Sequence, residues 1–436
     1  MRWIFLLSAG LAFAQDTLPL SLKRAVEIAL APEGSPRVAL AEESIRQSQT
    51  GIAQARAAFL PDIETSVTDQ SETVNLRSFG LNFPLPAGVS FPSLVGPFSV
   101  FDARATAQQS VFDFSSIRKY QSSKVTVEAT KADAETTRNQ VSDTVARSYL
   151  ACLRADAKLE TERANVDLSD ALLKLSNRQK TAGTGLAIEV TRAQVQLAND
   201  RQNLIVAEND RRKAVLQLLR SMGLNLDAHI EFTDKLAYNP VDVGPMEAAI
   251  DKARKERAEL KAQARREEIA KLNYGSVKAE RLPSLSAFGN YGTIGPEIVG
   301  ALPTRSVGIT LKVPVFDGGR RDARRAESLS QLRQEEIRSR DVKQQVELDV
   351  RLALDSIKSA ASQVDTAREG LALAENELAQ ARRRYEGGVA NSIEVTDAQT
   401  RLDRARDNSI AALYNYNLAR LDLATATGSI AEYLNQ

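Results

Sequence analysis

The sequence contains little of the chemistry that most enzymes use. Among 436 residues there is one cysteine, Cys152, and one histidine, His229. A single cysteine excludes an internal disulfide framework, and His229 has no metal-ligating or catalytic residue types clustered around it in the sequence. No nucleotide-binding loop, zinc-ligand spacing or nucleophile motif occurs. We therefore predict no enzymatic activity, no cofactor and no bound metal.

Aromatic residues and net charge are also low. Aromatic side chains make up 5% of the chain, and the formal net charge is +1. Near-neutral charge gives no bulk attraction to nucleic acid, so we predict no nucleic-acid partner. Alanine, leucine and charged residues dominate instead, a balance typical of long two-faced helices rather than of a compact globular core.

Long hydrophobic runs are missing as well. Residues 1–14 combine Arg2, a short apolar run and the small-residue pattern Ala12-Phe13-Ala14, which predicts a secretory signal peptide. That run is too short to span a bilayer, and no later run is longer. If the mature chain enters a membrane, it must do so with β-strands, because backbone polar groups in lipid need internal partners.

The strongest pattern present is a heptad repeat between Val350 and Tyr385. Large apolar residues recur every seven positions, and an alanine follows each of the first five by three positions. This period predicts a left-handed supercoil with a partner helix, and the alanines let the two backbones approach closely. The next helix repeats the pattern from Val395 to Ala426, interrupted by Ser409. We therefore predict a long antiparallel coiled-coil hairpin.

The same plan occurs twice along the chain. Ile188 to Thr191 recurs as Ile393 to Thr396, and Gly223 recurs as Gly428, both 205 positions later. We predict a first structural repeat over residues 15–223 and a second over 244–428, joined by a linker over 224–243 and followed by a tail over 429–436. The predicted strands and hairpins are 62–111 and 115–222 in the first repeat, and 284–315 and 319–427 in the second.

Each repeat is predicted to supply two strands. In the second, Val307, Ile309 and Leu311 alternate with smaller or polar residues, which indicates a strand with one apolar face. Four strands cannot close a barrel, and an open edge cannot lie in lipid. If these strands are in a membrane, several chains must share one barrel, and three chains would supply twelve strands. The alternative is a small soluble sheet that caps the coiled coil.

Together these features resemble the outer-membrane efflux proteins of the TolC type. The resemblance also includes the motif from Arg257 to Leu260, the pair Leu282-Pro283, the run from Val315 to Gly319, and the hairpin turn from Tyr385 to Asp397. It implies a mainly α protein with a small β part, in which a duplicated helix–strand–strand–helix plan builds a periplasmic α-barrel. Four strands per chain would complete a trimeric, twelve-stranded outer-membrane β-barrel.

The resemblance also implies a function and partners. The protein would be a passive outer-membrane exit channel of a tripartite efflux pump or a type I secretion system, conducting small molecules or polypeptides. It would form a homotrimer in outer-membrane lipid, reach into the periplasm, and dock to a periplasmic adaptor and an inner-membrane pump of the RND, ABC or MFS type. The alternative is a soluble periplasmic coiled-coil adaptor or scaffold protein, although such adaptors carry a single hairpin between other domains.

The implied functional residues lie at the two hairpin turns. Glu394 and Asp397, with Glu189 in the first repeat, would line a constriction, and three copies of these acids would favour cations. Tyr385 falls where the family has a gating tyrosine, but it is equally a core residue by its heptad position. Glu394 also fits a capping box with Asn391. A locking arginine known in the family is absent here, where Ala390 stands. The predicted adaptor-docking residues are Gly183, Thr184, Gly185, Leu186, Gly387, Gly388, Val389 and Ala390.

Overall fold

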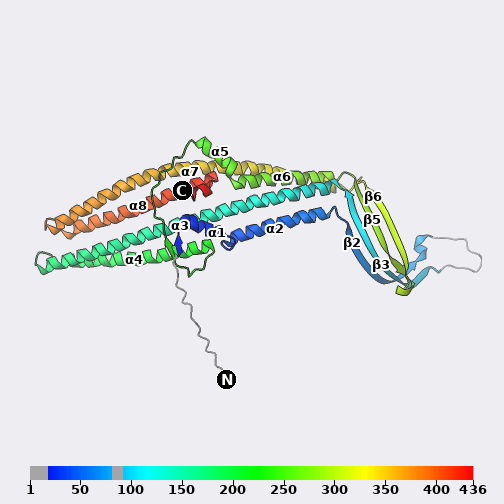
Figure 1. The fold of residues 1–436 in the computed structure, drawn as a ribbon, viewed down its shortest axis with the longest axis horizontal. Coiled ribbons are helices and arrows are strands. Elements are labelled where there is room, and N and C mark those ends of the chain that lie inside the picture. The colour runs from blue at the N-terminus through cyan, green and yellow to red at the C-terminus, as the bar shows by residue number, and fades with distance from the viewer. Residues whose placement is uncertain (1–17, 81–91, 436) are drawn as a thin grey trace, which may run out of the picture. The chain divides into compact units, whose positions relative to one another are not determined.

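The computed structural model describes residues 18–80 and 92–435, and the predicted signal peptide over residues 1–14 lies outside them. The chain forms two compact units. The first unit is made of the chain up to Ser44, of Lys131–Ala262 and of the chain from Arg340 onward. The second is made of Ile45–Thr130 and Gln263–Ser339 and contains a four-stranded sheet. The structure confirms the predicted class, mainly helical with a small β part (Figure 1).

The described helices and strands follow the duplicated plan. The helices are α1 (Leu22–Leu30), α2 (Pro36–Ala57), α3 (Phe114–Thr181), α4 (Ala187–Met222), α5 (Met246–Glu256), α6 (Ala258–Ala279), α7 (Arg320–Glu386), α8 (Ser392–Thr427) and α9 (Ile430–Tyr433). The strands are β1 (Leu18–Leu20), β2 (Asp62–Asn75), β3 (Leu94–Phe112), β4 (Ile230–Phe232), β5 (Ser284–Gly295) and β6 (Leu302–Lys312). None of the described helices has an apolar stretch long enough to cross a membrane.

Helices α7 and α8 form the hairpin that the heptads predict. Buried residues of both helices share two hydrophobic clusters, one around Ile357, Val364 and Tyr416 and one around Leu378 and Val395. The alanine positions of the pattern lie in the same clusters. These alanines are Ala360, Ala374, Ala381, Ala398, Ala412 and Ala419. The alternation of large residues with alanine therefore packs two long helices along one dry seam.

The core of the first unit lies where its N-terminal segment meets α3 and α4. Tyr149 on α3 is completely buried, and its hydroxyl donates to the Leu20 carbonyl oxygen at 2.9 Å and contacts an Asp234 carboxylate oxygen at 2.9 Å. Strand β1, which contains Leu20, pairs in parallel with β4 of the linker. One aromatic side chain thus connects the start of the chain, the first hairpin and the linker.

One predicted helix is divided in the structure. The pattern predicts a single helix from about Gly244 to Glu280, but α5 ends at Glu256 and α6 begins at Ala258. Arg257 has an extended backbone, and its guanidinium donates to Asp349 on α7 at 3.0 Å and to Glu259 at 3.2 Å. Contacts to a distant helix therefore set this break, which sequence periodicity alone does not show.

The first hairpin, α3 and α4, has buried polar residues at heptad positions where the second hairpin, α7 and α8, has apolar ones. Glu162 on α3 stands 205 positions before Ala367, so it occupies an alanine position of the heptad, yet it is only 1% exposed. Its carboxylate pairs with Lys158 at 2.6 Å. Asp200 on α4 is buried nearby and accepts hydrogen bonds from Ser169 and, at 2.9 Å, from Gln196.

This seam extends to the second hairpin. Lys158 also pairs with Asp407 on α8, and the Asn165 side-chain amide donates to Asp403 on α8 at 2.6 Å. Burial raises the pKa of the Asp200 carboxyl, and the charges of Asp403 and Glu162 act in the same direction, against the hydrogen bonds from Ser169 and Gln196. The buried carboxylates of Glu162 and Asp200 and the half-buried Asp403 therefore lie close together where the hairpins meet.

We expect Asp200→Asn to raise the midpoint of thermal unfolding at neutral pH. The pKa of Asp200 is higher in the folded state than in the unfolded chain, so the folded state binds the proton more tightly. Wild-type stability should therefore fall as pH rises through the folded pKa and recover on acidification, whereas the uncharged amide removes this dependence. Circular dichroism melts over a pH series would measure both effects.

Asp210→Asn is the matched control for this experiment. Asp210 lies on the same helix but is exposed, and it pairs with Lys213 at 3.3 Å. Its substitution should leave both the midpoint and the pH dependence close to wild type. An Asp200→Asn protein that is less stable than wild type at neutral pH would show that the charge of Asp200 stabilises the seam.

Candidate functional site

The first candidate surface is the sheet of the second unit. Its strand order is β2-β3-β5-β6, and every neighbouring pair is antiparallel. β2 and β6 are therefore the two edges, and each has one side without a strand partner in the described part of the chain. The alternating pattern predicts a strand over Val307–Val315, whereas β6 begins at Leu302 and ends at Lys312. β6 therefore begins five residues earlier and ends three residues earlier than the alternating pattern predicts.

The registers place apolar residues of all four strands on one face of the sheet. Ile63 pairs with Ala107, Ala107 with Gly289, and Gly289 with Val307, so these four residues form one row. Side chains in such a row point to the same face. Further members of this apolar face are Val67, Ala103, Ala105, Leu285, Ala287, Tyr291, Ile309 and Leu311.

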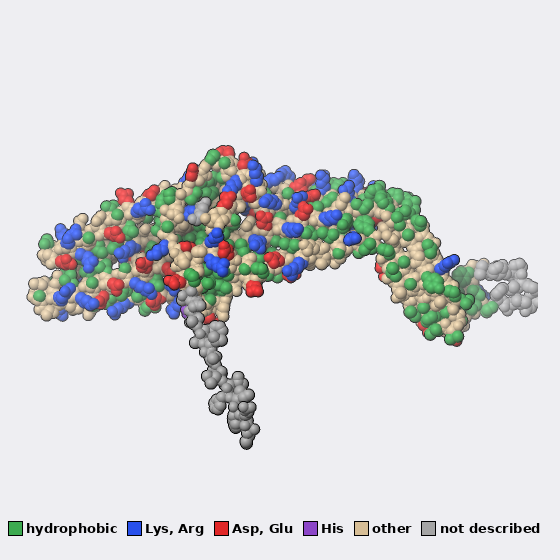
Figure 2. Space-filling view, viewed as in Figure 1, with side chains coloured by type: hydrophobic (Ala, Val, Ile, Leu, Met, Phe, Trp, Pro, Cys, Tyr) green, Lys and Arg blue, Asp and Glu red, His purple; other side chains and the backbone are tan. Residues whose placement is uncertain are grey.

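The apolar face is also exposed in the single chain. Val307 is 85% exposed and Ile309 73%. An exposed surface of this kind marks contact with lipid or with another protein. In the space-filling view, hydrophobic side chains cover much of the visible surface of the sheet (Figure 2). Two charged residues, Asp69 and Arg305, also lie on this face, toward the end where β5 connects to β6.

The opposite face of the sheet is mainly polar, although Phe288, Ile294 and Leu302 also lie on it. Glu64 pairs with Thr106, Thr106 with Asn290, and Asn290 with Ser306, which gives a row without any apolar residue. Arg104 on the same face forms an ion pair with Asp102 at 2.6 Å. The sheet thus separates an apolar side from a water-compatible side, as a membrane strand that borders an aqueous channel must.

The second candidate surface is formed by the two hairpin turns of the first unit. Gly183 follows the end of α3 with a φ of +76°, and Gly388 follows the end of α7 with a φ of +70°. Both angles lie in the left-handed region that glycine adopts without strain, so each glycine ends one helix and reverses the chain. Beyond them Leu186 and Val389 are 68% and 73% exposed. The remaining predicted docking residues, Thr184, Gly185, Gly387 and Ala390, belong to these same turns.

Glu394 has a basic partner at the second turn. The Asn391 side chain caps α8 and accepts from the backbone N–H groups of Ile393 at 3.1 Å and Glu394 at 3.2 Å. The Glu394 carboxylate forms an ion pair with Arg384 Nε of α7 at 2.8 Å. Glu394, which the family resemblance places at a constriction, is therefore also explained by helix capping and by its ion pair with Arg384.

The other predicted constriction residues are separated. Glu189 accepts a hydrogen bond from the backbone N–H of Leu186 at 3.3 Å and caps α4. Glu189 and Tyr385 line one narrow crevice between the hairpins, whereas Asp397 is exposed and outside that lining. The single chain thus brings Glu189 and Tyr385 to one place but does not gather all three acids.

Tyr385 is buried at the start of the second turn. Its ring is 4% exposed and packs in the hydrophobic cluster of α7 and α8. Its hydroxyl lies 3.3 Å from Ser176 Oγ on α3. A core residue of the second hairpin therefore also forms a polar contact with the first hairpin.

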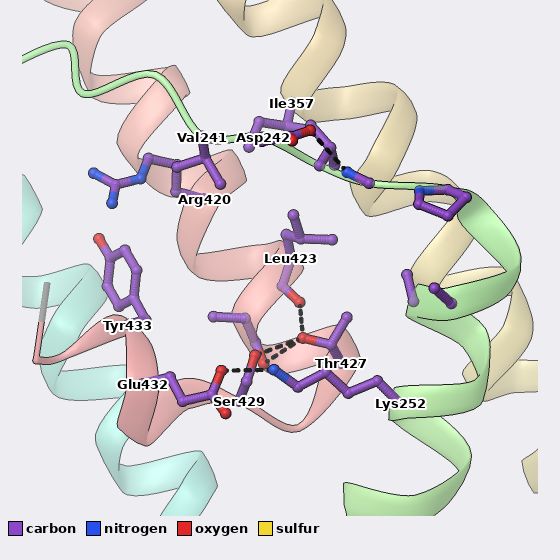
Figure 3. A pocket seen from close by; sticks show the side chains of 16 residues that line it. Val241, Asp242, Lys252, Ile357, Arg420, Leu423, Thr427, Ser429, Glu432 and Tyr433 are labelled. Carbon is purple, nitrogen blue, oxygen red and sulfur yellow. Dashed lines mark hydrogen bonds and ion pairs between the residues drawn. The ribbon is translucent and has the colours of Figure 1, made fainter.

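A cavity of about 340 Å³ lies beside α5, α8 and α9 (Figure 3). Lys252 and Glu432 form an ion pair at 2.6 Å, and the Thr427 and Ser429 hydroxyls lie 2.7 Å apart. The guanidinium of Arg420 lies over the Tyr433 ring. The polar groups around the cavity thus contact one another and join α5, α8 and the C-terminal helix α9.

The rare reactive residue types are not arranged for chemistry. Cys152 is completely buried, and burial together with the Asp156 charge raises the pKa of its thiol to about 12. His229 is exposed in the linker. Within residues 18–80 and 92–435, no group of three or more histidine, cysteine, aspartate or glutamate side chains is placed to hold a metal ion.

Sequence reasoning missed the partners of the predicted site residues. Arg384 is the ion-pair partner of Glu394, and Ser176 is the contact of Tyr385. Ser176 was identifiable only as a small heptad residue, with no sign that it faces the other hairpin. Arg384 belongs to a run of three arginines at the end of α7, and that run was a usable signal for a charged contact across the turn.

Comparison with known proteins agrees with this architecture. The profile of the family described as "Outer membrane efflux protein" matches residues 28–224 and 249–429. The outer membrane protein TolC of Vibrio cholerae is 24% identical over 297 residues, covering 66% of this chain and 67% of that protein. The alkaline protease secretion protein AprF of Pseudomonas aeruginosa is 23% identical over 450 residues, covering 99% and 89%. The pyoverdine export outer membrane protein OpmQ of Pseudomonas putida is 24% identical over 416 residues, covering 93% and 84%.

Solved structures show the same fold. The outer membrane protein VceC of Vibrio cholerae superposes with a TM-score of 0.77 at 18% identity, covering 93% of this chain and 96% of that one. The CmeC outer membrane channel of Campylobacter jejuni gives a TM-score of 0.79 at 15% identity, covering 95% and 88%. Because the family profile matches both halves of the sequence, the chain belongs to the outer membrane efflux protein family and works as an efflux channel of the outer membrane.

Proposed function

We propose that three copies of this chain form one passive exit channel. The observation that carries this proposal is the open four-stranded sheet, which has one apolar face, one mainly polar face and two edges without a strand partner in the described part of the chain. Pairing β6 of one copy with β2 of the next would satisfy both edges and close twelve strands into a barrel. The apolar face would then contact lipid, and the polar face would line the channel.

The helical part of each chain would extend this channel into the periplasm. Each chain contributes two structural repeats, over residues 15–223 and 244–428, and each repeat ends in one long hairpin. Exposed Leu186 and Val389 at the turns offer small apolar contacts to the tip of another helical hairpin. We propose that these turns, with Gly183, Gly388 and their neighbours, dock a periplasmic adaptor that connects the channel to an inner-membrane pump.

The constriction would lie at the same end. Glu189, Tyr385, Glu394 and Asp397 are all within or next to the turns, and the Tyr385–Ser176 contact joins the two hairpins of one chain. Separating the hairpins would break this contact and widen the entrance. No locking arginine is available at Ala390, so the closed state would depend more on the tyrosine contact and on the polar seam between α3 and α8.

The names of two relatives support a range of cargo. OpmQ is named for pyoverdine export, and AprF for alkaline protease secretion. The cargo class of this chain therefore includes small molecules and polypeptides, and the pump would be of the RND, ABC or MFS type. The rival function, a soluble periplasmic adaptor or scaffold, leaves the exposed apolar face and both sheet edges without a partner.

We expect Val307→Arg to reduce the amount of trimer in the outer membrane and Ser306→Arg to leave it near wild type. The two residues are adjacent on β6 but belong to the apolar and polar faces respectively. Arginine on a lipid face near the bilayer midplane costs about 2–4 kcal/mol per chain, whereas arginine on a channel wall stays hydrated. Membrane fractionation with heated and unheated SDS gels measures the trimer. Wild-type protein recovered as a soluble periplasmic monomer would contradict the proposal.

Leu186→Asp and Val389→Asp should abolish efflux while trimers still assemble. A carboxylate at a hairpin tip would have to be desolvated on docking, which we expect to weaken adaptor binding about tenfold or more. Co-purification with the adaptor after cross-linking, together with drug susceptibility, would measure the loss. Gln202→Asp, an exposed substitution further along α4, is the control. Equal efflux by all three variants would exclude the turns as the docking surface.

Tyr385→Phe should increase the open probability of single channels roughly fivefold. The variant keeps the buried ring but removes a hydroxyl contact between the hairpins that is worth about 1 kcal/mol. Planar-bilayer recording measures the open probability. Tyr414→Phe, elsewhere on α8, is the control and should not change it. An unchanged open probability in Tyr385→Phe would restrict Tyr385 to a packing role.

A further inference from the structure

The hairpin tips carry more basic than acidic side chains. We define the tips as residues 176–196 and 380–400, which contain four acids, among them the predicted constriction residues, and six basic residues. Each chain therefore has two net positive charges in this region. The basic residues are Arg178, Lys180, Arg192, Arg382, Arg383 and Arg384.

The most prominent acid at the tips has a neutralising partner. Glu394 forms its 2.8 Å ion pair with Arg384, so its charge is largely balanced within the same chain. Glu189 is half-buried, and its carboxylate accepts from the backbone N–H of Leu186. Asp397 and Glu386 are the two exposed acids that remain. The predicted acidic ring is thus reduced mainly to Asp397.

The basic side chains are better exposed than the acids. Arg178, Lys180, Arg192 and Arg383 are all exposed, and none of them has a salt bridge within residues 18–80 and 92–435. Lys and Arg side chains are visible near the ends of both hairpins (Figure 2). These cations come from both hairpins, so the positive charge surrounds the tips instead of lying on one helix.

Helix dipoles do not cancel this excess. The basic residues at the ends of α3 and α7 lie near helix C-termini, where cations are favoured, and Glu189 and Glu394 lie near helix N-termini, where acids are favoured. Each tip combines one C-terminus with one N-terminus, so the partial charges of the two helices offset each other. The side-chain excess of two positive charges per chain remains.

Building on the trimeric channel proposed above, we propose that the hairpin tips form an anion-selective mouth that admits anionic small molecules in preference to cations. Three chains bring six net positive charges to one entrance, and a narrow entrance focuses such a field. Arginine binds carboxylate, sulfonate and phosphate groups through paired N–H donors. Organic anions carrying these groups are therefore the cargo class that the mouth concentrates.

The test is the reversal potential of purified trimers in a planar bilayer under a KCl gradient, which gives the chloride-to-potassium permeability ratio. We expect a ratio above one for the wild type. In the double variant Arg178→Glu/Arg383→Glu the ratio should fall at least about threefold, because twelve units of charge change at the entrance of a trimer. Asp397→Asn should raise the ratio.

Arg212→Glu is the matched control. Arg212 is exposed on α4 but lies outside the tips, so its reversal should leave the ratio near wild type. A wild-type ratio below one, or a double variant that shifts no more than Arg212→Glu, would overturn the anion-selective mouth and leave the channel itself intact. Trimers that form no conducting pore would overturn the channel proposal and, with it, the mouth.

Discussion

The sheet of the second unit depends on one constraint, the need of each backbone N–H and C=O group for a partner. β3 and β5 are paired on both sides, but β2 and β6 each have one edge without a strand partner among the residues that the structure describes. In water such an edge promotes aggregation, and in lipid each unpaired group costs several kcal/mol. The apolar face adds a second demand, because Val307 and Ile309 are exposed in the single chain. If copies of the sheet were arranged around an axis in lipid, the strand edges would pair with each other and the apolar face would contact lipid.

The helical unit depends on how its long helices pack, and the contacts within the second hairpin differ from those between the two hairpins. The seam between α7 and α8 is dry and contains alanine, so those two helices behave as one rod. Between α3 and the second hairpin the contacts are mixed. Lys158 pairs with Asp407 and Asn165 bonds to Asp403. Leucines of α3, among them Leu172, also pack against the apolar cluster of α7 and α8. The Lys158 and Asp407 side chains are partly exposed, so water can replace their ion pair at low net cost, whereas a dry seam allows no such exchange. The contact between the two hairpins therefore depends partly on charge, whereas the seam between α7 and α8 is apolar.

Sequence patterns predicted the parts of the fold that repeat with a fixed period. The heptads between Val350 and Tyr385 identified the partner helix and its seam, and the alternation around Val307 identified a strand with an apolar face. The break at Arg257 was not predicted, because it depends on Asp349, almost a hundred residues away. The same limit applied at the tips. The position of Glu394 followed from its motif, but its pairing with Arg384 depends on how α7 and α8 align across the turn.

The two halves of the duplication have diverged where charge replaces alanine. Ala367 occupies a seam position in the second hairpin, and its counterpart in the first is Glu162, buried with Lys158 as its partner. Removing a carboxylate from water is unfavourable unless a cation and hydrogen bonds compensate, and Lys158 must also serve Asp407. The first hairpin thus gives up part of the stability that an alanine seam would provide. In return, its contact with the second hairpin depends partly on charge, which an apolar seam does not. The two hairpins thus differ in what holds them together, alanine packing in the second and a buried charged group in the first.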